Sequence, residues 1–303
     1  MVMQNLKDTI VNSGIEKALK RIKAVSDQRQ IERDEPSPEL KTWRNLRPDE
    51  LHQGYLIPKG GYISTITLDY CGRCQEGFTF KSDGRYRTAA FCQDCEIPRR
   101  RLKRIEQAQL PLDARDAHIG MYDFDSAHQE NQVAEILSYK LGEDMPPSML
   151  MHGSSGNGKT TLLYAIAKEL AWRGMRVRYT THTRLFEAEK RSWSGKDRSP
   201  MESWLDGIDV LLFDELGGIG GDARASEWYR DKTKEMLGLI YERWTAGELA
   251  VIMTTNLSPA QIVKRLLDNS QAMVSRLKSI FPDPVEMTGH DRRAKQEKTI
   301  WDI

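Results

Sequence analysis

The sequence predicts an α/β protein built on a parallel β-sheet that carries a phosphate-binding loop. Residues 153–160 read GSSGNGKT and match the pattern G-x-x-x-x-G-K-[ST]. Residues 148–152 before them have the length and apolarity of a short buried strand, and residues 161–172 have the apolar stripe of a helix. From residue 148 onward strand and helix signals alternate, which is typical of a parallel sheet covered by helices on both faces.

Length and composition limit the class of protein. The chain has 303 residues, sufficient for two domains and a sizeable core. Charged residues make up 29% of the chain, and no apolar run approaches the roughly 20 residues of a membrane span. The first residues lack the continuous apolar core of a signal peptide, so we expect a cytoplasmic protein without membrane contact. The net charge is only +1, so any surface for nucleic acid must be local.

The region before the phosphate loop divides into three parts. We expect an N-terminal helix and linker over residues 1–35, a small module over 36–98, connecting helices over 99–147 and the nucleotide-binding core over 148–303. The helix, over about residues 3–30, either packs on its own domain or docks on a partner, and both readings stay open.

The four cysteines of the chain predict a metal site. They form two C-x-x-C pairs separated by seventeen residues, which is a zinc-ribbon spacing: Cys71, Cys74, Cys92 and Cys95. Four thiolates close the tetrahedral shell of a zinc ion and leave no open position for catalysis, so the predicted zinc is structural. Two disulfides or a redox motif are the alternatives, and a cytoplasmic location disfavours disulfides.

A basic run follows the second cysteine pair. A helix is expected to begin at Pro98, and residues 99–104 contain five cations. They would either bind phosphates or form the solvated face of a helix that joins two domains, and the sequence does not decide between these readings.

The phosphate loop is expected to hold the nucleotide. Gly153 and Gly158 allow a tight backbone turn whose N–H groups face a polyphosphate, next to a helix N-terminus. Lys159 would reach the β- and γ-phosphates, and the Thr160 hydroxyl would ligate Mg²⁺. The expected nucleotide-binding residues of this loop are Gly153, Ser154, Ser155, Gly156, Asn157, Gly158, Lys159, Thr160 and Thr161.

A later strand that ends in two carboxylates indicates that the bound nucleotide is hydrolysed. Residues 208–213 are apolar and lead into Asp214 and Glu215, which matches a Walker B element. Asp214 would hold Mg²⁺ directly or through water, and Glu215 would polarise the attacking water as a general base. The sequence therefore predicts an ATPase that uses ATP and Mg²⁺, with Zn²⁺ in the cysteine module.

Three later segments complete the predicted site. Asn256 follows an apolar strand over residues 250–254. At a strand tip between the two Walker elements it would orient water or touch the γ-phosphate, whereas by itself it is also a common turn residue. Arg276 either projects from its helix into the site of a neighbouring subunit or is an ordinary exposed arginine, which is the simpler reading from the sequence alone. Arg292 and Arg293 follow a short fifth strand at residues 285–287 and are candidate nucleotide sensors. The chain ends about ten residues later, so no full C-terminal helical lid is expected.

Taken together, these motifs resemble a known family. The order HGSSGNGKTT, LLFDELGG, MTTN, VSRLKS and GHDRR is similar to that of the AAA+ ATPases of the DnaC/DnaI helicase-loader group and the related IstB transposition ATPases, over roughly residues 100–300. The resemblance implies an AAA+ core with a five-stranded parallel sheet, Asn256 as the sensor-1 residue and Arg276 as the arginine finger. It places Arg292 or Arg293 at the sensor-2-like position.

The resemblance also implies nucleic-acid contacts. Residues 181–205 fall where initiators and loaders carry a helical insertion used for single-stranded DNA. The cations of this segment are Arg184, Lys190 and Arg191. The rings of Phe186 and Trp193 would stack on bases.

A cysteine module ahead of the core is similar to the DnaI arrangement, in which that module contributes to helicase binding, and IstB-like proteins typically lack it. We therefore expect a homo-oligomeric, ATP-dependent loader of a DnaB-type replicative helicase onto single-stranded DNA, in a bacterial or phage-infected cell. The alternatives are an IstB-like regulator of DNA transposition that binds target DNA, and an adaptor that binds ATP without useful turnover.

Overall fold

A five-stranded, fully parallel sheet forms the centre of the molecule. The computed structural model describes residues 51, 55–65, 71–82, 84, 86–138, 147–192, 199–218 and 227–289. The strand order is β6-β7-β8-β5-β9, which confirms the predicted fold class. The strands are β5 (Met149–His152), β6 (Val177–Thr181), β7 (Val210–Leu216), β8 (Ala250–Thr255) and β9 (Val285–Glu286). Because all strands are parallel, their carboxyl ends meet at one edge, where α/β proteins bind ligands.

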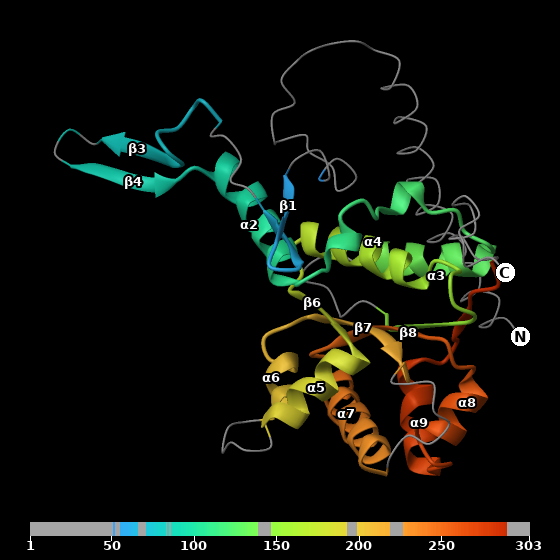
Figure 1. Ribbon diagram of the computed structural model, residues 1–303. Helices are drawn as coiled ribbons and strands as arrows, with labels where there is room; N and C mark the ends of the chain where they lie inside the picture. The colour runs from blue at the N-terminus through green and yellow to red at the C-terminus, as the bar shows by residue number, and fades with distance from the viewer. Residues whose placement is uncertain are drawn as a thin grey trace, which may run out of the picture.

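Helices cover both faces of this sheet (Figure 1). One face carries α2 (Gln93–Gln107), α3 (Ala127–Ser138) and α4 (Lys159–Trp172), together with the short 3-10 helices η3 (Leu112–Ala114) and η4 (Ile119–Met121). The other face carries α5 (His182–Ser192), α6 (Pro200–Leu205), α7 (Glu227–Thr245), α8 (Pro259–Arg265) and α9 (Gln271–Ile280).

The alternation of side chains along each strand explains the two layers. On β8, Ile252 packs into the cluster on the α4 side, whereas Val251 and Met253 pack into the cluster on the α7 side. Successive side chains of a strand point to opposite faces, so a strand buried on both faces reads as a continuous apolar run. This is the pattern that residues 250–253 show in the sequence.

Two small hairpins precede the sheet. β1 (Leu56–Lys59) and β2 (Tyr62–Thr65) form the first, and β3 (Phe78–Ser82) and β4 (Arg87–Phe91) form the second. The first lies against the end of α2 and the residues after it, where the Ile63 amide donates to the Leu110 carbonyl at 2.9 Å and the Ser64 hydroxyl donates to the Glu106 carboxylate at 2.9 Å. The second projects away from the body of the protein (Figure 1).

Helix α2 begins earlier than the sequence indicates. The expected start was Pro98, but the helix begins at Gln93, and the amides of Cys95 and Glu96 already donate to the Cys92 carbonyl. Asp94 and Glu96 lie in the first turn, where negative charge interacts favourably with the helix dipole. The same helix therefore carries part of the cysteine module at its start and contacts the core farther along.

Two predicted features lie outside the described residues, namely the N-terminal helix and the last residues of the chain. Within the described residues, no helix is long and apolar enough to cross a membrane.

Candidate active site and cysteine cluster

The phosphate loop has the backbone conformation that its glycines permit. Gly153, Gly156 and Gly158 have φ angles of 139°, 86° and 88°, all in the left-handed region that favours glycine. A Cβ atom on Gly153 would lie 2.4 Å from the Met287 carbonyl oxygen. The loop is thus closed tightly against the segment that follows β9, and the fully buried Asn157 amide donates to the same carbonyl at 2.5 Å.

Lys159 lies inside this loop. Its Nζ donates to the carbonyls of Gly153 and Ser154 at 2.8 and 2.6 Å and to Asn157 Oδ1 at 3.0 Å. The side chain is 6% exposed, so the three oxygen acceptors compensate a charge that has left water. A polyphosphate bound at the N-terminus of α4 would give the Lys159 ammonium oxygen acceptors that also carry negative charge. Ser154, Ser155 and Thr161 are exposed around this position.

The Asp214 carboxylate joins four parts of the site. It is 2% exposed and accepts hydrogen bonds from the Thr160 hydroxyl at 3.2 Å, the Tyr179 hydroxyl at 3.1 Å, the Thr254 hydroxyl and the Glu215 amide at 3.1 Å. Burial, followed by the nearby Asp214 charge, raises the pKa of Tyr179, so this hydroxyl remains a donor. The Asp214 carboxylate is therefore held at a defined place beside the start of α4.

Glu215 sits in a bulge of β7. Its φ angle is 57°, and the pairing of β7 with β8 shifts register between Phe213 and Leu216. Its amide donates to the Thr254 hydroxyl at 3.0 Å as well as to Asp214, and its side chain is exposed although both neighbours are buried. A bulge of this kind re-aims one side chain out of the regular alternation. Here it turns the Glu215 side chain to the surface at the carboxyl end of the sheet.

Asn256 and Arg276 occupy different places. Asn256 is exposed directly after β8, at the same edge as Glu215. Arg276 is exposed on α9, where its guanidinium carbon lies 5.3 Å from the centre of the Tyr241 ring of α7. Among the described residues, Arg276 makes no hydrogen bond to the phosphate loop. Their roles as sensor and finger stay predictions, and Arg292 and Arg293 lie outside the described residues.

A buried histidine connects the end of β7 to the helices below it. His182 is fully buried, and its Nδ1 accepts from the Gly217 amide at 2.8 Å and contacts the Tyr229 hydroxyl at 2.7 Å. Its Nε2 lies 3.3 Å from the Thr233 hydroxyl. Burial lowers the pKa of His182 to about 3, so the ring is neutral, and an acceptor role at Nδ1 places its proton on Nε2. No signal in the sequence singled out this residue.

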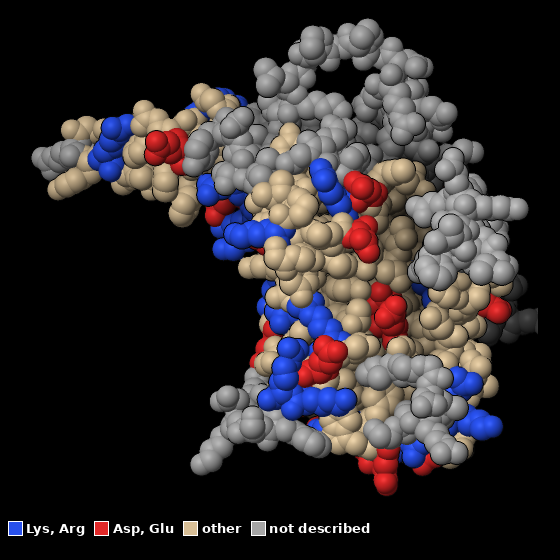
Figure 2. Space-filling model, viewed as in Figure 1, with Lys and Arg blue, Asp and Glu red and all other residues tan. Residues whose placement is uncertain are grey.

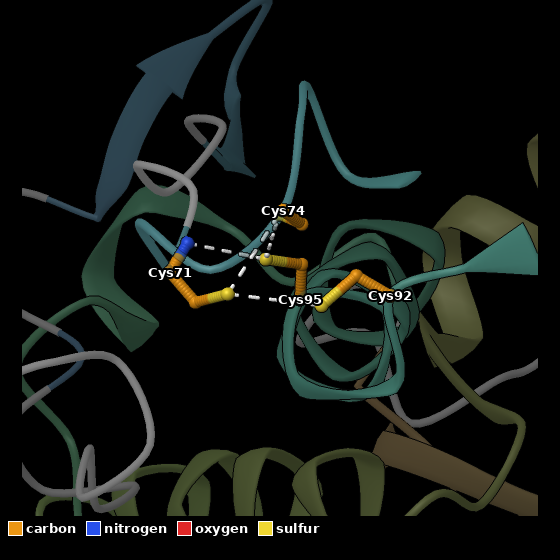
Figure 3. A group of neighbouring side chains, drawn as sticks. All are labelled: Cys71, Cys74, Cys92 and Cys95. Atoms are coloured by element: carbon orange, nitrogen blue, oxygen red, sulfur yellow. Dashed lines mark hydrogen bonds between the residues drawn. The ribbon is translucent and has the colours of Figure 1, made fainter. Parts of the chain in front are cut away.

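The four cysteines converge on one point (Figure 3). Cys71 and Cys74 come from the loop before β3, and Cys92 and Cys95 come from the start of α2. The sulfur of Cys71 lies 3.7 Å from those of Cys74 and Cys92, the sulfurs of Cys74 and Cys95 are 3.5 Å apart, and all four lie within 4.8 Å of one another. Four sulfurs placed tetrahedrally at about 2.3 Å from one ion are about 3.8 Å apart, so the cluster fits zinc.

The segment predicted to stack on DNA bases is partly inaccessible. Phe186 is 1% exposed and its ring packs against those of His182, Trp228 and Tyr229. The prediction for Phe186 is therefore wrong, because α5 turns this side chain into the core below the sheet. Trp193 lies outside the described residues.

The cations of the same segment also have partners within the protein. The Arg184 guanidinium lies 4.7 Å from the ring centre of Tyr62 and 5.0 Å from that of Trp204, and it donates to Gln109 at 2.9 Å. Arg184 thus joins the first hairpin to α6. Lys190 and Arg191 are exposed, and Arg191 donates to a carbonyl of its own helix.

Comparison with known proteins identifies the family. The family described as IstB-like ATP binding protein matches residues 95–299. The chain belongs to this family. Its membership confirms the predicted resemblance to the IstB-related ATPases and establishes the core as an ATP-binding domain.

Several solved structures are also similar. A crystal structure of DnaI has 23% sequence identity and a TM-score of 0.47, over 61% of this chain and 94% of DnaI. A crystal structure of the DnaC helicase loader has 21% identity and a TM-score of 0.47, over 58% of this chain and 99% of DnaC. AMPPCP-bound DnaA from Aquifex aeolicus has 20% identity and a TM-score of 0.43, over 57% of this chain and 50% of DnaA. No curated protein matches the chain significantly.

The site of this IstB-like protein fits a magnesium nucleotide. The Thr160 hydroxyl and the Asp214 carboxylate offer hard oxygen ligands 3.2 Å apart, and Mg²⁺ prefers such ligands. Sequence reasoning found both residues but missed Tyr179 and Thr254, which orient Asp214 from β6 and β8. Only the strand order brings these two hydroxyls to Asp214.

The first prediction concerns pH and stability. In the unfolded chain His182 has an ordinary pKa near 6.5, whereas in the folded protein burial depresses it to about 3. Below about pH 6.5 the unfolded chain binds a proton at His182 and the folded protein does not. The free energy of unfolding is therefore undiminished by His182 above about pH 6.5 and falls as the pH drops from there toward about 3. Between about pH 7.5 and about pH 5.5, the free energy of unfolding of the parent should fall by about 1.4 kcal/mol more than that of His182→Gln. Urea unfolding at both pH values measures this, and equal losses in both proteins would contradict the burial effect.

The second prediction concerns the cysteine cluster. The purified protein should contain about one zinc ion per chain, and Cys92→Ser/Cys95→Ser should contain none, since half of the ligand shell is lost. Chelation should lower the melting temperature of the parent, because metal binding contributes to the folding of small modules. Elemental analysis and a thermal melt measure both effects. Thr88→Ala, on the nearby hairpin, is the control that should keep its zinc. A parent protein free of zinc after expression in zinc-replete medium would refute the site.

Proposed function

We propose that this protein is an ATP-dependent loader that places a DnaB-type replicative helicase on single-stranded DNA. The observation that supports this proposal most directly is the course of α2. This continuous helix contains Cys95 of the cysteine cluster near its start, and it packs Leu102 and Ile105 into the core of the ATP-binding domain. A partner held by the cysteine module would thus be joined rigidly to the nucleotide site. IstB-like proteins without such a module have no equivalent attachment.

Hydrolysis in this proposal uses the residues around Asp214. Asp214 and the Thr160 hydroxyl would hold Mg²⁺, which would supply positive charge beside the phosphates. Lys159 would exchange its loop carbonyls for phosphate oxygens. Glu215, turned outward by the β7 bulge, would accept a proton from the attacking water, and Asn256 at the adjacent strand end would orient that water.

The proposed finger acts on a second copy of the chain. Arg276 is exposed on α9 and lies over Tyr241, so it is available to a neighbouring subunit. An arginine supplied by a neighbour stabilises the charge of the transition state and makes turnover depend on assembly. The working form would therefore be a homo-oligomer that assembles with ATP, DNA or the helicase.

The third prediction tests this shared site. Lys159→Ala and Arg276→Ala should each lose most ATP turnover, measured as phosphate release with single-stranded DNA present. An equal mixture should recover up to about a quarter of the parent rate, because a competent interface needs the lysine from one variant and the arginine from the other. Lys278→Ala, also exposed on α9, is the matched control that should retain turnover. Full activity of Arg276→Ala alone would exclude the finger.

The fourth prediction tests the function itself. The parent should bind a replicative helicase and increase unwinding of a fork whose single strand is coated with binding protein. Glu215→Gln should still form the ATP-bound complex but should release the helicase slowly, because the general base contributes about 100-fold or more to turnover. If the parent neither binds the helicase nor stimulates loading, the proposed function is wrong.

The second candidate is a regulator of DNA transposition, favoured by the IstB-like family of residues 95–299. Such a protein would prefer duplex DNA and form ATP-dependent filaments on it. Binding of matched single-stranded and duplex oligonucleotides, with and without ATP, discriminates between the two candidates.

A further inference from the structure

The second hairpin presents aromatic side chains to solvent. Phe78 on β3 is 37% exposed, Phe80 on β3 is 42% exposed and Phe91 on β4 is 60% exposed. Within the described residues, β3 and β4 pair only with each other as strands of a two-stranded ribbon, and the ribbon projects from the body (Figure 1). Folded proteins normally cover aromatic rings, so a row of exposed rings indicates a binding surface.

The register places these rings on one face of the ribbon. Phe78 pairs with Phe91 and Phe80 pairs with Ala89, so all four lie on the same side. The rings of Phe78 and Phe91 are 5.0 Å apart, and the Arg87 guanidinium lies 4.2 Å above the Phe80 ring on this side. The opposite side carries small or polar residues, which are Thr79, Lys81, Thr88 and Ala90.

The charge around this aromatic face favours an anionic partner. Among the described hairpin residues 78–82, 84 and 86–91, Lys81 and Arg87 are the charged residues, and both are cations. The ribbon leads directly into α2, on which Arg99 and Lys103 are exposed. Figure 2 shows Lys and Arg on the projecting hairpin and again along the concave edge beneath it, with Asp and Glu side chains among them in both places. Exposed aromatic rings next to exposed cations fit a ligand that carries both flat rings and negative charge.

We propose that the aromatic face of the β3–β4 hairpin binds single-stranded DNA, with bases stacked on Phe80 and Phe91 and phosphates bound by the cations of α2. Base stacking on aromatic residues beside a basic track is the recurrent chemistry of single-strand binding. The five-residue strands span about 16 Å and the 15-residue helix about 22 Å, long enough together for several nucleotides.

This inference rests on the proposed function, because it adds a DNA contact to a protein that we propose acts on single strands. It places that contact on the second hairpin and on α2, outside the segment 181–205 expected from the family resemblance. A protein surface is the competing occupant of an aromatic face. A mainly apolar protein partner would gain little from the cations, whereas a single strand uses the rings and the charges together.

The experiment separates stacking from charge. Binding of a labelled thymidine oligonucleotide of about 16 nucleotides, and of an abasic strand of equal length, is followed by anisotropy without and with ATP over a range of salt concentrations. Phe80→Ala/Phe91→Ala should weaken thymidine binding about 10- to 100-fold and leave abasic binding nearly unchanged. Thr79→Ala/Thr88→Ala, on the opposite side of the same strands, is the matched control and should bind as the parent does. Equal zinc content shows that each variant has kept its module.

The cations of α2 should act differently. Arg99→Gln/Lys103→Gln should weaken both strands alike and should reduce the slope of log affinity against log salt by about 1.4, since each single-strand phosphate contributes about 0.7.

The outcomes also separate this inference from the proposed function. Unchanged thymidine binding by Phe80→Ala/Phe91→Ala overturns the hairpin site and leaves the loader proposal standing. The same holds if these substitutions abolish capture of the helicase while DNA binding persists, which would assign the face to a protein. A parent that binds no single strand in any nucleotide state overturns the inference and the proposed function together.

Discussion

A buried carboxylate organises the site on which the rest of this protein depends. Asp214 is almost inaccessible to water, and a buried charge is stable only when donors surround it. Three of its four donors are hydroxyls, from Thr160 on α4, Tyr179 on β6 and Thr254 on β8. Tyr164 of α4 lies within hydrogen-bond distance of Tyr179 and extends the chain of hydroxyls. Solvating one charge therefore fixes how α4 sits against three neighbouring strands.

Three further hydrogen bonds connect this arrangement to the elements on either side of it. On one side, Asn157 binds the Met287 carbonyl, so the short strand β9 is held by the phosphate loop itself. The buried Gln129 of α3 donates to the Glu286 carbonyl and supports β9 from the outer layer. On the other side, His182 accepts from Gly217, directly beyond the β7 bulge. The phosphate loop is thus tied through β9 to α3, and the end of β7 is tied to α5, in each case by hydrogen bonds of buried side chains.

The sequence predicted those parts that depend on local pattern. The phosphate loop, the two carboxylates and the cysteine pairs are motifs in which spacing and chemistry are both constrained, and the strands are apolar runs buried on both faces. Thr254 and Tyr179 could not be found in this way, because they act through strand register between segments far apart in the chain. The prediction for Phe186 is wrong because about half a turn of a helix, one or two residues, separates a core position from a surface position, as the exposed neighbour Glu187 shows.

The start of α2 shows a different limit. Pro98 is a reasonable helix start, since its missing N–H costs nothing in a first turn. Here the helix begins at Gln93, because the Cys92 carbonyl accepts the first helical hydrogen bonds at the cysteine cluster. The consequence is mechanical. A helix that began at Pro98 could hinge at its junction with the cysteine module, whereas one that already contains Cys95 transmits any displacement of that module to Leu102 and Ile105 in the core. The cysteine cluster and the core therefore share one helix, with Cys95 near its start and Leu102 and Ile105 farther along.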